Sequence, residues 1–178
     1  MKVFAQLLSA GLLITCAQFA NAQNQGPAPS PFCKIEQKVG LTDVTVEYSR
    51  PGVKDRKIFG DLVPYDKPWR TGANSATKFT FSTDVTVGGK ELAAGSYAVI
   101  TVPGKENWEV RFYPHESTRW NTYVDDENAK PVVVTAETGE LSFTLETFVI
   151  NLDHLRDNSA TIVFAWENTV ATVGMTVP

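Results

Sequence analysis

Three arginines, Arg50, Arg56 and Arg70, lie in one segment of the chain together with Trp69 and Asn74. A guanidinium group presents its N–H donors in a rigid fork that suits carboxylate and phosphate, and Asn74 can add an amide donor. Trp69 offers the flat, amphipathic face on which a sugar ring can stack. These five residues therefore predict a surface that binds an anionic or saccharide ligand.

The same segment, residues 50–74, carries its own carboxylates at Asp55, Asp61 and Asp66. In the alternative interpretation the arginines bind these carboxylates or backbone carbonyls, because an irregular segment must satisfy its backbone groups. The loop would then be a packing plug and the protein a structural scaffold. Since loops of this length are uncommon in compact domains unless they are functional, both interpretations stay open.

Acid–base chemistry has one candidate pair in a loop, His115 and Glu116. An enzyme built on it would be a hydrolase or lyase whose arginines bind an acidic substrate, with His115, Asp61 or Glu116 as the general base. No serine lies in a G-x-S-x-G context, the two histidines lack metal-binding spacing, and residues 125–127 lack the central glycine of a calcium loop. We therefore expect a non-catalytic protein without metal or cofactor, and keep the enzyme as the alternative.

The overall charge is mildly acidic, with 16 Lys and Arg against 20 Asp and Glu and a net charge of −4. Non-specific nucleic-acid binding needs a basic footprint, so we expect no nucleic-acid partner. This composition still leaves room for a small local basic patch.

The first residues have the features of a signal peptide. Lys2 is followed by an apolar run over 7–19 and by the A-x-A cleavage site Ala20-Asn21-Ala22. Cleavage at this site predicts a signal peptide of residues 1–22 and export to the periplasm or the extracellular medium. In the alternative, Cys16 is the lipidated residue of a lipoprotein signal. No stretch reaches the roughly 18–20 apolar residues of a membrane span, so we expect a protein that does not span a membrane.

Residues 23–32 are rich in Pro, Gln and Asn and predict a tether before the folded domain. Cys33 follows in this Pro-rich lead-in and is the only cysteine left once the signal is removed, so no internal disulfide is expected. We expect an incidental free thiol, and intermolecular pairing is the alternative.

Beyond residue 40 the chain alternates apolar and polar residues over short stretches, the pattern of half-buried strands. Turn signals separate these stretches, among them Gly88-Gly89, Thr138-Gly139 and Glu167-Asn168. No helical period persists for three turns, and single helical turns are expected only at 58–62 and 125–129. The expected strands cover 44–48, 79–82, 85–87, 97–102, 108–112, 132–134, 141–145, 162–166 and 171–177.

Strands at this spacing are typical of an all-β sandwich or barrel. We predict a single-domain antiparallel β-sandwich, jelly-roll-like and of roughly nine strands, over residues 33–178. The segment 50–74 is expected to be one long structured loop that packs across an end of the sandwich or along a sheet edge.

Four motifs carry a resemblance to a known family: Tyr48-Ser-Arg-Pro, Arg56-Lys-Ile-Phe-Gly, Leu62-Val-Pro-Tyr and Trp69-Arg-Thr-Gly-Ala-Asn74. They closely resemble the signature of a bacterial secreted family, domain of unknown function 2911. The resemblance is continuous from about Pro31 through Gly104 and weaker from there to Pro178.

The resemblance implies export and a single domain. It brings no established activity, ligand or catalytic residue that could be assigned to positions of this chain. One departure is Asp55, where the family is expected to favour glycine before the arginine, so the turn at 53–56 is the least certain part of the match.

Overall fold

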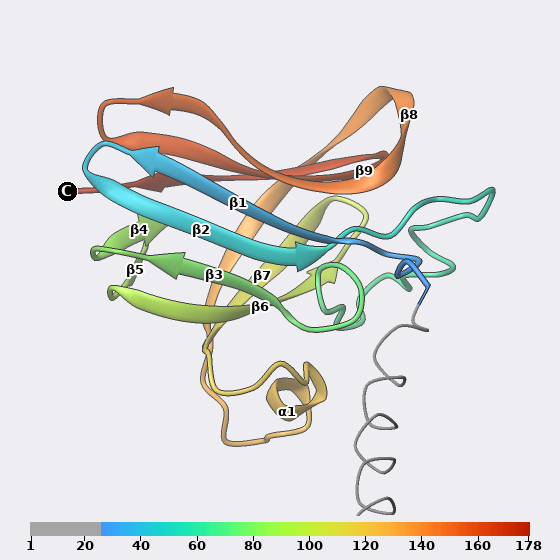
Figure 1. Cartoon of the computed structure of the whole chain (residues 1–178), viewed down its shortest axis with the longest axis horizontal. Helices are drawn as coiled ribbons and strands as arrows, with labels where there is room; N and C mark the ends of the chain where they lie inside the picture. The colour runs from blue at the N-terminus through green and yellow to red at the C-terminus, as the bar shows by residue number, and fades with distance from the viewer. Residues whose placement is uncertain (1–25) are drawn as a thin grey trace, which may run out of the picture.

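The structure is a computed structural model that describes residues 26–178, and the predicted signal peptide 1–22 therefore lies outside the described residues. The described part contains nine strands and one short helix (Figure 1). The elements are β1 (Phe32–Val39), β2 (Thr42–Ser49), β3 (Thr77–Phe81), β4 (Val85–Val87), β5 (Lys90–Leu92), β6 (Gly95–Pro103), β7 (Asn107–Pro114), α1 (Asn121–Val124), β8 (Val132–Arg156) and β9 (Ser159–Thr176).

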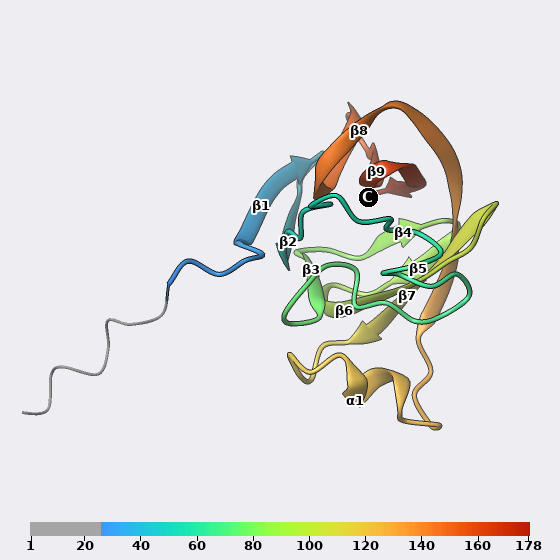
Figure 2. The same ribbon diagram turned by 90° about the vertical axis from the view of Figure 1, so that its right-hand side faces the viewer.

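All nine strands belong to one antiparallel sheet in the order β1-β2-β3-β6-β7-β8-β9-β4-β5. Seen end-on, the sheet curls around its own interior, and α1 lies outside β6 and β7 (Figure 2). The prediction of a single-domain, all-β antiparallel fold is confirmed. A sandwich is compatible with this curled sheet, and its jelly-roll form stays a prediction.

The longest strands, β8 and β9, form a hairpin that bends in its middle. Glu140 pairs with Thr169, but the next pair is Leu145 with Glu167, so the register shifts and β8 bulges between them. Turns predicted at 138–139 and 167–168 were wrong, because both sites lie inside these strands. Glu167 instead takes a left-handed φ of 53°, and the chain bends there without ending the strand.

Strand β1 is absent from the sequence-based prediction, which placed the first strand at residue 44. It pairs with β2 along its whole length at the edge of the sheet, and its side chains are mostly exposed or half-buried. Cys33, Ile35 and Val39 pack against the core from one face of β1, but Gln37 interrupts their apolar alternation. Cys33 lies in this strand opposite Tyr48, as a free and half-buried thiol.

The core lies inside the curled sheet and is rich in aromatic side chains. Trp108 and Trp166 are each 1% exposed, and Phe79, Phe112 and Phe164 are fully buried around them. A second, smaller cluster lies on the outer face of the sheet, where Trp120 and Tyr123 of the α1 region cover Ala76, Ala98, Ile100 and Tyr113. Within residues 26–178 no helix is long and apolar enough to cross a membrane.

The predicted long loop, residues 50–74, closes one end of this core. Its apolar side chains Ile58, Phe59, Val63 and Trp69 are buried among those of the strands. The backbone of the loop is tied down by isolated bridges from Gly52 to Thr147 and from Trp69 to Thr101. In Figure 1 this segment runs in teal and green along the right-hand end of the strands. The predicted helical turn at 58–62 is an irregular set of turns instead.

Candidate functional site

Two of the predicted site arginines bind backbone carbonyls. Nε of Arg50 donates to the carbonyl of Phe148 at 2.9 Å, which fastens the start of the loop to β8. Arg56 donates from Nε to Val53 O at 3.0 Å and from Nη2 to Gly52 O at 2.6 Å. These bonds match the carbonyl form of the structural interpretation. Pairing with Asp55, Asp61 or Asp66 is not observed, since the ion pairs of the described residues involve Lys34, Lys38, Lys78 and Arg111.

Trp69 is a core residue with 9% of its surface exposed. Its ring stacks on Trp166 with centroids 5.9 Å apart, and its edge meets Phe59. Its Nε1 donates to Gly72 O at 3.1 Å within the same loop. No face of this indole is left for a sugar ring, so Trp69 positions the loop.

Asn74 is exposed, but its side-chain amide is already used. Nδ2 donates to Ser30 O and to Ser49 Oγ, both at 3.1 Å. The amide thereby joins the segment before β1 to the end of β2.

Arg70 differs from the other four predicted residues. Its side chain is half-buried, and its buried Nε has no hydrogen-bond partner within residues 26–178. The guanidinium carbon lies 5.7 Å from the centroid of the Trp120 ring, a cation–π arrangement. Of the predicted cluster, Arg70 is therefore the cation that neither a carbonyl nor a carboxylate of the described chain occupies.

A groove of about 170 Å³ opens beside this region, between the end of β2, the start of β3 and the segment after β7. We call it the His115 groove. The hydrogen bond from Ala76 N to Thr118 O, at 2.9 Å, joins its two sides. Its lining includes Phe32, Glu47, Ser49, Ser75, Lys78 and His115.

Arg70 is close to this groove in the chain and in the fold. The loop from Arg70 returns to the start of β3 through a bond from Thr77 N to Arg70 O at 3.3 Å, and Ser75 and Ala76 lie within that loop. On the other side, Thr118 lies two residues before Trp120. Arg70 and Trp120 therefore lie near the groove without lining it.

The charges of the groove are partly balanced. Lys78 and Glu47 form an ion pair between neighbouring strands β3 and β2. His115 is half-buried, and its backbone N–H is bound to Ser96 O at 2.9 Å.

Tyr48 lies at the groove but is held by the core. Burial raises the pKa of Tyr48 to about 12. Its hydroxyl accepts from Ile150 N at 3.0 Å and donates to Ile150 O at 3.3 Å. The phenol therefore stays neutral at physiological pH, and it fastens β2 to the far half of β8.

The structure does not bring the five predicted residues to one point, because Arg50, Arg56 and Trp69 face the chain itself. Sequence reasoning missed Ser75, Lys78 and Thr118 as residues of the His115 groove. The only feature of the sequence that could have indicated them was their nearness along the chain to Arg70 or His115. Which face of the sheet the segment 115–131 would cover could not be read from that signal.

The acid–base candidates do not form a compact group. Asp61 and Glu116 are exposed in separate loops, and His115 lines the groove. Within the part of the chain that the structure describes, no three His, Cys, Asp or Glu side chains are placed to hold a metal ion.

Comparison with known protein families gives a match over most of the chain. The model of the family described as Protein of unknown function (DUF2911) matches residues 30–175. No curated protein and no solved structure matches the chain.

Proposed function

Since the chain belongs to the DUF2911 family, whose description assigns no activity, we propose a function from the chemistry of the site. The protein is an exported, non-catalytic binding module that recognises a small anionic ligand, including the carboxylate of a sugar acid, through Arg70 near the His115 groove. Export rests on the N-terminal pattern of Lys2, the apolar run and Ala20-Asn21-Ala22. Cell fractionation with N-terminal sequencing tests this part, and a mature chain starting near Gln23 is expected.

The observation that carries the binding proposal is that the buried Nε of Arg70 has no hydrogen-bond partner within residues 26–178. A buried donor left without a partner costs about 1–3 kcal/mol, and a ligand that accepts a hydrogen bond from the guanidinium would remove that cost. The contact with the Trp120 ring limits the positions of the guanidinium, so less side-chain freedom is lost when a carboxylate or phosphate binds.

The test is a thermal-shift screen of the purified protein against inorganic phosphate, small carboxylates, sugar acids and their neutral counterparts. A ligand present at about a hundred times its dissociation constant adds roughly 2.7 kcal/mol of stability. We expect this stabilisation from anions, its loss in Arg70→Gln, and its retention in Arg119→Gln.

Arg119 is the matched control because it is exposed, precedes Trp120 directly in the chain and carries the same charge as Arg70. Equal loss in both variants would mean that general charge attracts the anion. No anion-dependent shift in a folded wild-type protein would overturn the proposal.

The burial of Ile58, Phe59 and Trp69 favours a second candidate, in which the loop is a plug and the domain a structural scaffold. It predicts that Arg70→Ala lowers the melting temperature while no ligand of the screen has any effect. An anion that stabilises the wild-type protein and fails to stabilise a folded Arg70→Ala variant would contradict this candidate.

A further inference from the structure

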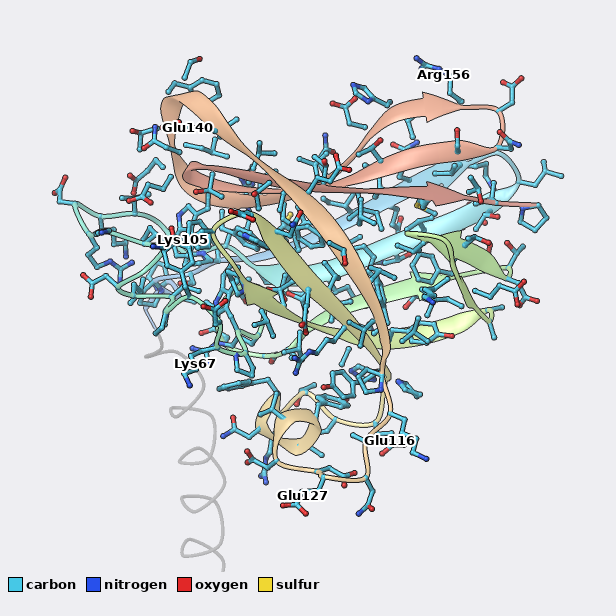
Figure 3. All side chains as sticks on the ribbon, turned by 180° about the vertical axis from the view of Figure 1, so that it is seen from behind. Lys67, Lys105, Glu116, Glu127, Glu140 and Arg156 are labelled. Atoms are coloured by element: carbon cyan, nitrogen blue, oxygen red, sulfur yellow. The ribbon has the colours of Figure 1, made fainter. Side chains whose placement is uncertain are left out.

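A second pocket, of about 360 Å³, lies at the end of the molecule that the long loop closes. We call it the Tyr65 pocket. Figure 3 shows Lys105 and Glu140 at this end, from the β6–β7 turn and from β8. The volume lies within the range of small-molecule sites. Its lining includes Tyr65, Lys105, Thr138, Glu140, Asn168 and Thr169.

The ring of Tyr65 is held in a fixed position. Gly60, at a φ of +87°, lies against it so closely that a Cβ there would be 2.8 Å from Cε2 of Tyr65. The next residue, Asp66, takes a left-handed φ of 58° and donates its N–H to Pro103 O at 2.8 Å. The ring is therefore a preformed wall whose orientation the backbone sets.

The opposite wall is formed where the β8–β9 ladder is interrupted. Between the pairs Glu140–Thr169 and Leu145–Glu167, four residues of β8 face Asn168 alone. Within residues 26–178 the Asn168 side chain makes a single hydrogen bond, from Thr144 Oγ1 to Oδ1 at 3.4 Å. Its two amide hydrogens therefore remain available to a ligand.

The charged groups of the pocket have opposite signs. Lys105 Nζ lies 5.9 Å from the Tyr65 centroid, and neither Lys105 nor Glu140 is in an ion pair of the described residues. The Thr138 hydroxyl is already used, because it donates to Glu106 O. The free groups are thus one ammonium, one carboxylate, one amide and the Thr169 hydroxyl beside an aromatic ring.

This combination fits a neutral sugar better than an anion, a metal or an apolar ligand. Lys105 and Glu140 together give no net charge, one carboxylate is too few for a metal ion, and polar groups surround the single ring. Sugar hydroxyls both donate and accept hydrogen bonds, and the C–H face of a sugar packs on a flat aromatic surface. We propose that the Tyr65 pocket is a binding site for a neutral saccharide, independent of the anion site at Arg70.

The test is an amide NMR titration of the full-length mature protein with glucose, galactose, mannose, N-acetylglucosamine, maltose and cellobiose at millimolar concentrations. At least one sugar is expected to shift the amides of Lys105, Gly139 and Thr169 in a saturable way, with Gly88 and Gly89 unmoved. Asn168→Ala should weaken that binding at least about tenfold, and Asn158→Ala, an exposed turn residue, should not.

Three outcomes would overturn the proposal: no sugar of the panel shifts these amides, Asn168→Ala binds like the wild type, or Asn158→Ala weakens binding equally. Tyr65→Phe adds a milder variant that keeps the ring, and it should bind within about threefold of the wild type. Because Arg70→Gln leaves the Tyr65 pocket unchanged, sugar binding in that variant separates this site from the anion site.

Discussion

Tyr48 joins two strands that are distant in sequence through its hydroxyl, which both donates to and accepts from the backbone of Ile150. Removing that hydroxyl leaves a buried N–H and carbonyl without partners. We therefore expect Tyr48→Phe to lower the free energy of unfolding by about 1–3 kcal/mol, measured by urea denaturation at neutral pH. A loss as small as that of Tyr97→Phe, whose hydroxyl donates to Ala93 O in an exposed setting, would contradict this role.

The same phenol makes stability depend on alkaline pH. Its folded pKa of about 12 lies above that of an unfolded tyrosine, about 10. The unfolded chain therefore loses its proton first, and the stability contributed by Tyr48 is complete below pH 10 and falls as the pH rises toward 12. Melting temperatures across this window should drop more steeply for the wild type than for Tyr48→Phe. Parallel curves would contradict the prediction.

Residue types alone predicted the candidate site only in part. The sequence indicates that Arg50, Arg56 and Arg70 are cations in a loop, and it does not indicate which carbonyls the loop leaves open. Phe148 O accepts from Arg50 because the loop pairs with β8 at Thr147, whereas Arg56 binds carbonyls of its own loop. Arg70 faces Trp120 because the segment after β7 covers the outer face of the sheet. The contacts of Arg50 and Arg70 depend on long-range packing that no local sequence pattern contains.

At the scale of elements, the loop 50–74 is part of the core. Trp69 contacts Phe59, Trp108, Phe148 and Trp166, so it connects the loop to β7, β8 and β9. The loop therefore cannot be shortened past this residue without opening the end of the core.

Trp69→Ala should lower the free energy of unfolding by about 3–5 kcal/mol through the cavity that it leaves. Trp120→Ala, on the half-buried outer face, is the matched control and should lose clearly less. Chemical denaturation of both variants measures the difference. If Trp69→Ala does not fold, Trp69→Phe provides a second variant that should lose less of the free energy of unfolding. Equal losses for Trp69→Ala and Trp120→Ala would mean that the loop only covers the surface.

Strand patterns were predictive wherever one face is buried and the other is not. The alternation of β2, β3 and β7 matches their burial closely. Prediction failed where burial or pairing changes along a strand, as in β1 at the edge and at the β8–β9 bend. Thr138-Gly139 and Glu167-Asn168 have the composition of turns, but pairing between β8 and β9 continues past both sites, so the strands do not end there.

At the scale of the whole molecule, the sheet has two edges, β1 and β5. An exposed edge strand can pair with another chain unless it is very short or carries charged side chains. β5 spans only Lys90–Leu92, and the longer β1 carries Lys34 paired with Glu36, and Lys38 paired with Asp43 at 2.6 Å.

Replacing Lys34 and Lys38 together by valine should therefore promote self-association through β1. Analytical ultracentrifugation should show dimers or larger species for this double variant and less association for the wild type at the same concentration. Lys67→Val with Lys130→Val, two exposed loop positions, is the matched control. Association of the control to the same degree would point to lost net charge instead of an unprotected edge.

The placement of the four tryptophans has a spectroscopic consequence. Trp69, Trp108 and Trp166 pack together in the core, with Trp69 centroids 6.1 Å and 5.9 Å from the other two. Trp120 lies apart from them on the outer face, beneath the guanidinium of Arg70. Fluorescence of the core group follows unfolding, whereas emission from Trp120 responds to whatever approaches Arg70. The protein therefore carries an intrinsic optical reporter at its proposed anion site, and the reporter needs no added label.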